Sequence, residues 1–211
     1  MMNVAIAVVL AIWAASAGIP WMVRRFSKAR RLFGATQAIK IADAQEGLIR
    51  VRGVVRSENC LEAPLSRRAC IGYRIEIDEY RGRMWLPVLR EADLRSFVID
   101  DGSGSLFVDV GINEVRRVDG PSNVRMELKS DLTLRSGILV GHSEGLTRFM
   151  MSRQADRSRW TSLRCSESSI RSGESVSILG FAERNDDVSQ GQGVRTKIVG
   201  SPTVPIYIKS D

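Results

Sequence analysis

An alternating pattern of apolar and charged residues between Leu48 and Tyr80 constrains the fold of this chain more than any other feature of its sequence. In the first half of the stretch, one face consists of Ile49, Val51, Gly53 and Val55, and the other of Arg50, Arg52, Val54 and Arg56. In the second half, the apolar face consists of Ile71, Tyr73, Ile75 and Ile77, and the polar face of Arg74, Glu76 and Asp78. A period of two is typical of strands with one buried face. We therefore expect two β-strands joined by a loop.

The rest of the chain predicts more short strands and one helix. The expected strands are 84–88, 97–100, 106–110, 124–134, 175–183, 194–199 and 204–208. Leu146, Phe149 and Met150 have helical spacing after a possible cap at Ser143, which predicts a short helix that covers the end of a barrel. Pro205 indicates an edge strand. The predicted fold is mostly β, a compact closed or nearly closed barrel with one inserted short helix, preceded by a single transmembrane helix.

An apolar segment precedes the β region. Residues 4–23 carry no charge, and a helix of this length is about 30 Å long, which suffices to cross a bilayer. The interfacial residues expected at its end are Trp21, Arg24, Arg25, Lys28, Arg30 and Arg31. The cationic cluster after the segment predicts an N-terminus outside and a domain in the cytoplasm, in a single-pass protein of the inner or plasma membrane. Ala15-Ser16-Ala17 resembles a signal-peptidase site, but no positive residue precedes the apolar run.

These features divide the chain into an anchor at 1–23, a basic juxtamembrane linker or helix at 24–46 and a β domain at 47–211. The formal net charge is +7, from 31 basic and 24 acidic residues. Because five of the basic residues belong to the cluster beside the anchor, the remainder of the chain is almost balanced. The charge distribution therefore favours the bilayer, through residues 4–23, as a partner and disfavours nucleic acid.

The sequence contains no recognisable catalytic, cofactor-binding or metal-binding motif. Cys60, Cys70 and Cys165 form no C-x-x-C pair, and we expect reduced thiols, with a Cys60–Cys70 bridge as the open alternative. His142 is the single histidine, and no nucleophile or orienting carboxylate lies at a recognisable spacing from it. The acidic pairs at 100–101 and 186–187 are typical of turns. We therefore predict a chain without catalytic residues, cofactor or metal.

Several segments, taken in order, resemble the GIDE-type domain of mitochondrial membrane-bound E3 ubiquitin ligases and their prokaryotic relatives. The similar segments are Arg56-Ser57-Glu58-Asn59, Leu61-Glu62-Ala63-Pro64-Leu65-Ser66, Cys70, Tyr73, Trp85, residues 97–104, 167–174 and 176–180, and Pro205-Ile206-Tyr207-Ile208. The resemblance runs from about Gly47 to the end. It implies a β-rich domain held beside a membrane.

The chain also departs from this family. The eukaryotic ligases carry a second transmembrane span and a RING, whose two zinc sites need eight Cys and His ligands. Three cysteines and His142 cannot supply them, so the resemblance gives a family label without ligase activity. The mitochondrial members also place this domain between membranes, whereas the charge rule predicts the cytoplasm here.

The sequence is most consistent with a membrane-anchored, non-catalytic protein-interaction module with an unidentified protein partner. The candidate interaction residues are Glu58, Glu62, Pro64, Ser66, Arg67 and Arg68. The alternative for this loop is that Pro64 and Ser66 only shape the connection between two core strands. Two other functions remain open: a barrel that binds a polyanion, saccharide or lipid headgroup through Arg50, Arg52 and Arg56, and a ligase-like protein or hydrolase in which His142 takes part.

Overall fold

The computed structural model describes residues 30–111, 124–128, 132–136, 144–153, 162–185, 195–200 and 204–211. The chain forms two units, Met1–Gln37 and Ala38–Asp211. In the first unit, residues 30–35 are helical, and Arg30 and Arg31 are exposed on that helix. The predicted span 4–23 and the predicted interfacial residues Trp21, Arg24, Arg25 and Lys28 lie outside the described residues. In the described part of the chain, no helix has the length and apolar character that a bilayer crossing requires.

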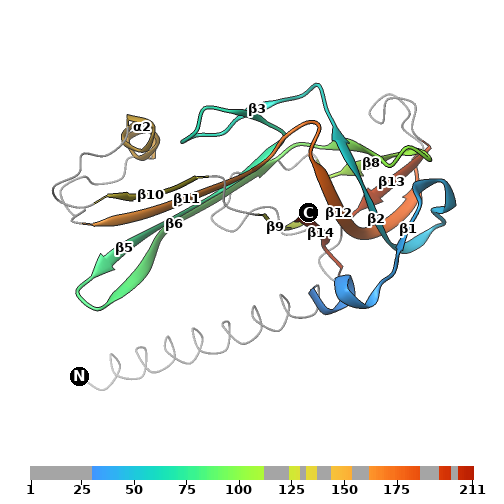
Figure 1. The fold of residues 1–211 in the computed structure, drawn as a ribbon, viewed down its shortest axis with the longest axis horizontal. Helices are drawn as coiled ribbons and strands as arrows, with labels where there is room; N and C mark the ends of the chain where they lie inside the picture. Colours follow the sequence, from blue (N-terminus) through green and yellow to red (C-terminus); the bar gives the residue numbers. More distant parts are fainter. Residues whose placement is uncertain are drawn as a thin grey trace, which may run out of the picture. The chain divides into compact units, whose positions relative to one another are not determined.

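The second unit is mostly β, and its largest sheet contains a closed barrel of five strands (Figure 1). The barrel strands, in spatial order, are β2 (Gly47–Arg56), β7 (Phe97–Asp100), β8 (Ser105–Asp109), β13 (Thr196–Val199) and β12 (Ser175–Arg184). The barrel closes because β2 pairs with β7 at its end and with β12 over 47–54. β8 and β13 are parallel, and the other barrel pairs are antiparallel. This confirms the predicted barrel.

Three further strands extend the same sheet. β1 (Ala38–Ile39) pairs in parallel with β2, so the second unit begins before residue 47. η1, a 3-10 helix (Ile41–Asp43), follows it. β14 (Ile206–Ser210) pairs with β12, and β9 (Val124–Glu127) pairs in parallel with β14. The prediction from Pro205 of an edge strand is therefore wrong, because Pro205 precedes β14 and both sides of β14 are paired.

The alternation in β2 places its apolar residues inside the barrel. Ile49, Val51 and Val55 are at most 7% exposed, whereas Arg52 and Arg56 are exposed, as predicted. Gly53 lies on the inner face, where an added Cβ would be 2.6 Å from the carbonyl oxygen of Asp100. The close approach of β7 to β2 therefore requires a residue without a side chain at this position.

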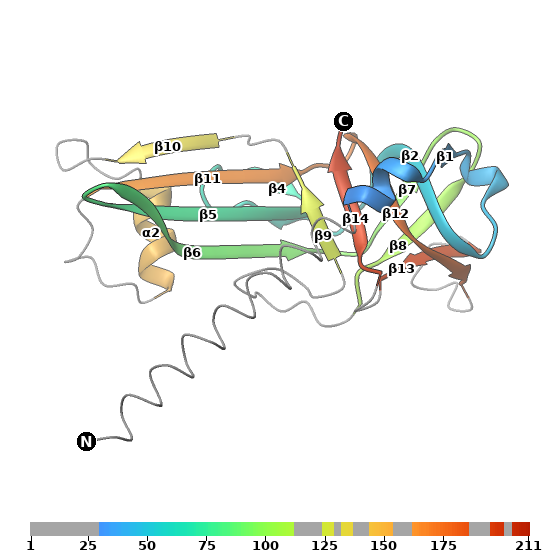
Figure 2. The same ribbon diagram turned by 90° about the horizontal axis from the view of Figure 1, so that it is seen from below.

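A second sheet has the order β10-β11-β5-β6 (Figure 2). Its strands are β10 (Leu132–Ser136), β11 (Leu163–Ile170), β5 (Gly72–Arg81) and β6 (Met84–Leu94). The second alternating strand of the sequence is β5, and its neighbours are β11 and β6, so the two strands that enclose the loop belong to different sheets. Tyr73, Ile75 and Ile77 share one buried face, whereas Ile71 belongs to the barrel core.

The helix α2 (Glu144–Ser152) packs on this second sheet. Leu146, Phe149 and Met150 are buried, as their spacing predicted. They join a core with Ile75, Ile77 and other residues of the sheet, so the predicted position of the helix over the barrel end is wrong. Two strand predictions also change: 124–134 is divided between β9 and β10 in different sheets, and the strand at 84–88 continues to Leu94.

Candidate functional site: a loop fixed from beneath by Glu167

The predicted interaction loop is a small ordered structure. β3 (Leu61–Glu62) and β4 (Ala69–Cys70) pair antiparallel, with Leu61 opposite Cys70 and Glu62 opposite Ala69. Between them, the Ala63 N–H donates to the Arg68 carbonyl and the Arg67 N–H donates to the Ala63 carbonyl, both at 2.9 Å. Arg67 has φ 62°, the left-handed conformation that closes tight turns. The loop is therefore a hydrogen-bonded turn on a two-stranded base.

The carboxylate of Glu167 holds the turn from the inner side. Glu167 lies on β11 and is fully buried. Its Oε2 accepts a hydrogen bond from the Leu65 N–H at 2.6 Å, and its Oε1 accepts one from the Ser66 N–H at 3.0 Å. Glu167 lies on a strand of the second sheet and is remote from the turn in sequence. These bonds therefore fix the turn to the second sheet. Hydrogen bonds from backbone amides to an ionised carboxylate are among the strong ones in proteins.

The buried part of the turn is apolar apart from this carboxylate. Ala63 and Leu65 are buried in the same core as Leu146 and Phe149 of α2. At Gly145 an added Cβ would lie 2.8 Å from the Leu65 carbonyl oxygen, so the start of α2 approaches the backbone of the turn closely. The turn thus lies between α2 and the strand that carries Glu167.

The outer part of the loop is charged. Glu58, Glu62, Arg67 and Arg68 are exposed, whereas Pro64 and Ser66 are half-buried. The Arg67 Nη1 lies 2.7 Å from the Glu62 Oε1, and both side chains are about half exposed, so this ion pair adds little stability. The six predicted residues therefore divide into four that face solvent and two, Pro64 and Ser66, that shape the turn.

A second buried acid, Glu91 on β6, fixes the other end of α2. Arg153, directly after the helix, donates from Nε and Nη2 to the two carboxylate oxygens of Glu91 at 2.7 and 2.6 Å. The Tyr73 hydroxyl donates to the same carboxylate at 2.9 Å. The hydrogen bonds to Glu91 raise the pKa of Arg153, although burial opposes this. Arg153 is therefore half-buried against the sheet, whereas Arg148 on α2 is exposed.

The cysteines divide into one exposed and two buried thiols, and all three are free. Burial, with the charge of Glu167, raises the pKa of Cys70 to about 11, and burial raises that of Cys165 to about 12. Both remain protonated near neutral pH, so neither is an activated nucleophile. The described residues contain no group of three His, Cys, Asp or Glu side chains placed to hold a metal ion. His142 lies outside them.

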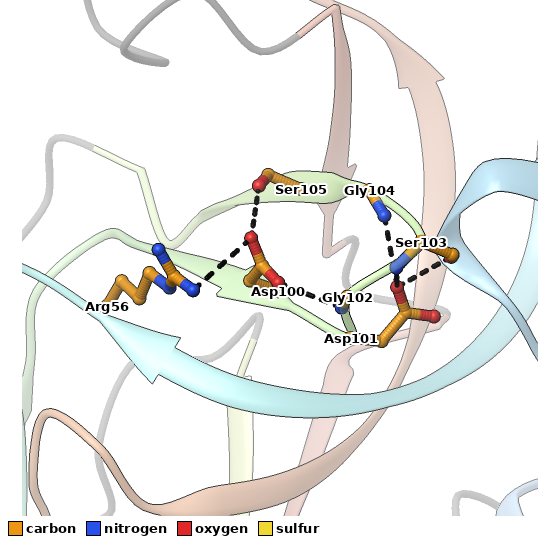
Figure 3. A network of polar contacts seen from close by, with 7 residues as sticks. All are labelled: Arg56, Asp100, Asp101, Gly102, Ser103, Gly104 and Ser105. Atoms are coloured by element: carbon orange, nitrogen blue, oxygen red, sulfur yellow. Dashed lines mark hydrogen bonds and ion pairs between the residues drawn. The ribbon is translucent and has the colours of Figure 1, made fainter.

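The acidic pair at 100–101 has a turn role, as predicted (Figure 3). Asp101 Oδ1 accepts hydrogen bonds from the Ser103 and Gly104 N–H groups at 2.8 and 3.2 Å, and its Oδ2 accepts one from the Ile41 N–H at 2.8 Å. Asp100 accepts from the Gly102 N–H and the Ser105 hydroxyl at 2.9 and 2.8 Å. The two carboxylates therefore already accept hydrogen bonds from the backbone amides of this glycine-containing turn. A phosphate bound in the turn would need the same amides.

The same turn predicts a pH dependence of stability. Burial alone would raise the pKa of Asp101, but the hydrogen bonds from Ser103, Ile41 and Gly104 outweigh it and lower the pKa below 3.8. A carboxyl whose folded pKa is depressed stabilises the fold above its unfolded pKa of about 3.9 and loses this contribution as the pH falls through the folded pKa. We expect Asp101→Asn to flatten the loss of stability below about pH 4. Urea unfolding at a series of acidic pH values measures this, and an unchanged slope would contradict it.

Two of the three arginines of the alternative barrel site already have acidic neighbours. Arg52 Nε lies 2.9 Å from Asp211 Oδ2, and Arg56 Nη2 lies 3.7 Å from Asp100 Oδ2. These contacts compete with any polyanion for the two guanidinium groups.

The prediction from sequence missed Glu167 as the residue on which the loop depends. A signal was present, because Glu167 follows Leu163 and Cys165 at every second position and therefore lies on the apolar face of its strand. Comparisons of the chain with protein-family models, with curated proteins and with solved structures found no match.

Proposed function

We propose that this chain is a membrane-anchored, non-catalytic β domain that binds a protein partner at the membrane surface through the outer face of the loop. The observation that supports this most is that the loop has a fixed inner side and an exposed, charged outer side. Its backbone is fixed by Glu167, whereas Glu58, Glu62, Arg67 and Arg68 face solvent. A recognition loop that is ordered before binding loses little entropy when the partner binds.

The position of Glu167 also supports the resemblance to the GIDE-type domain. Glu167 and the segment Ala63–Ser66 are two separate parts of that resemblance, and in the structure they bind each other. If the carboxylate of Glu167 and the turn form one structural unit, this explains why both segments belong to the pattern that the chain shares with these domains. We propose that the chain is a relative of these domains.

The partner that fits the loop carries both signs of charge. The exposed residues of the loop are two acids and two arginines, and mixed charges favour specificity of orientation over general attraction to a polyanion. The barrel alternative ranks second because Arg52 and Arg56 have acidic neighbours.

Site-specific photo-crosslinking in intact membranes tests the proposed interaction. A photoreactive residue at Glu58, Glu62 or Arg68 should give the same crosslinked protein, and the same residue at Val54 on the barrel surface should not. Val54 is the matched control because it is 41% exposed and lies outside the loop. Equal crosslinking from the loop and from Val54, or none from the loop, would argue against the proposal.

The proposed cytoplasmic position of the domain has a separate test. A membrane-impermeant maleimide should leave Cys60 unlabelled in intact cells and label it after permeabilisation. Cys60 is suited to this because it is the exposed cysteine, whereas Cys70 and Cys165 are buried. Labelling of Cys60 without permeabilisation would place the domain on the other side of the membrane.

A further inference from the structure

The tip of the β5–β6 hairpin exposes apolar side chains that neither the sheet core nor the loop explains. Met84 is 58% exposed, and Tyr80 and Val88 are each 41% exposed. The core that α2 and the second sheet share contains no residue of the tip between Tyr80 and Val88. Exposed apolar groups gathered on one projecting element mark surfaces that contact a protein or a membrane.

The aromatic residues of this tip are held in place. Tyr80 pairs with Trp85 across the hairpin, and their ring centres are 5.3 Å apart. The Arg164 guanidinium lies over the Trp85 ring at 5.0 Å and pairs with Asp78 at 2.7 Å. The Tyr80 hydroxyl donates to the Gly82 carbonyl at 3.1 Å within the turn. The tip therefore presents a fixed aromatic pair beside exposed aliphatic groups.

The charge of the tip has one sign. Residues 80–88 contain Arg81 and Arg83 and no acidic residue. Arg81 pairs with the buried Glu79 at 2.7 Å, while Arg83 is exposed at the turn. Trp and Tyr are the aromatic residues favoured at the level of lipid headgroups, and arginines beside them are attracted to anionic lipids.

We propose that the β5–β6 hairpin tip, residues 80–88, is a second membrane contact that binds the surface of an anionic bilayer. This rests on the membrane anchoring in the proposed function and is independent of the protein partner of the loop. Met84, Trp85 and Val88 enter the headgroup region, and Arg83 contacts lipid phosphates. The contact would hold the second sheet at the bilayer while the loop remains available.

The test uses the full chain incorporated into vesicles, with an environment-sensitive fluorophore on Met84→Cys in a Cys60→Ser background. The matched control carries the fluorophore on Met151→Cys, because Met151 on α2 is 59% exposed. In vesicles of phosphatidylcholine with phosphatidylglycerol, we expect blue-shifted emission at position 84, reversed by salt, and no shift at position 151. In phosphatidylcholine alone the shift should be much smaller. Arg83→Gln should reduce the ratio of bound to unbound tip about fivefold.

Each other outcome has a defined meaning. The same emission at position 84 in anionic and neutral vesicles would overturn the proposal, as would equal shifts at positions 84 and 151. A shift that grows with protein concentration in detergent without vesicles would assign the tip to contacts between copies and also overturn it. Failure of the anchor is distinguishable, because the chain would then not float with neutral vesicles at all.

Discussion

Replacement of Glu167 by alanine should lower the free energy of unfolding of the full chain by about 4 kcal/mol. The change leaves the buried Leu65 N–H and the half-buried Ser66 N–H without their acceptor and opens a cavity beneath the turn. Glu167→Gln keeps one carbonyl oxygen but turns an NH₂ group toward the other amide, so we expect about 2 kcal/mol. Urea unfolding in mild detergent, followed by tryptophan fluorescence, measures both losses.

Hydrogen exchange separates a local effect from a general one. Glu167→Gln should speed hydrogen exchange of the Leu65 and Ser66 amides more than exchange in β2 or β12 of the barrel. The reason is that the substitution weakens the hydrogen bonds that hold the turn, so the turn opens before the barrel does. The control is Glu62→Ala on the exposed side of the same loop, which should change stability by less than about 0.5 kcal/mol. A loss below about 1 kcal/mol for Glu167→Ala would show that the carboxylate does not hold the turn.

Replacement of Arg153 by methionine should cost about 3 kcal/mol in the free energy of unfolding, because it removes both guanidinium hydrogen bonds, and the cation that donates them, from the buried Glu91 carboxylate. Arg148→Met on the same helix is the matched control. Arg148 forms an exposed ion pair with Glu144, and its loss should cost less than about 0.5 kcal/mol. The same unfolding experiment compares the two variants.

The double variant Glu91→Leu with Arg153→Met shows whether the stranded charge causes the loss. Removing both partners should be less destabilising than Arg153→Met alone, since no carboxylate then remains buried without its cation. If the double variant is no more stable than Arg153→Met, the stranded carboxylate is not the cause of the loss, and the cost comes from the packing of the arginine on the Phe149 ring, whose centre lies 5.2 Å from the guanidinium carbon.

The local part of the fold was predictable from sequence. The period of two predicted the buried faces of β2 and β5, and the acidic pair at 100–101 predicted the turn between β7 and β8, because these features depend on neighbouring residues. The prediction of one strand at 124–134 was wrong because β9 and β10 share an apolar period, although β9 pairs with β14 and β10 with β11. The periodicity of apolar residues indicates a strand with an apolar face. It does not identify the sheet to which the strand belongs.

The long-range parts of the fold and the site were not predictable in this way. The barrel closes through the pairing of β2 with β12, and the loop is held by Glu167, and both contacts join residues more than a hundred positions apart. The sequence indicated which loop was unusual, but it could not show that Pro64 and Ser66 shape the turn while Glu62 and Arg67 face solvent.

The most direct test of the proposed function measures stability and partner binding on one variant, Glu62→Ala with Arg67→Ala and Arg68→Ala. All three side chains are exposed and none belongs to the core, so the free energy of unfolding should change by less than about 1 kcal/mol. Recovery of the crosslinked partner from membranes should fall at least about tenfold if these residues include the main binding contacts. Unchanged recovery of the partner would contradict a binding role for the loop. A large loss in the free energy of unfolding would also contradict it, because it would show that these side chains support the fold.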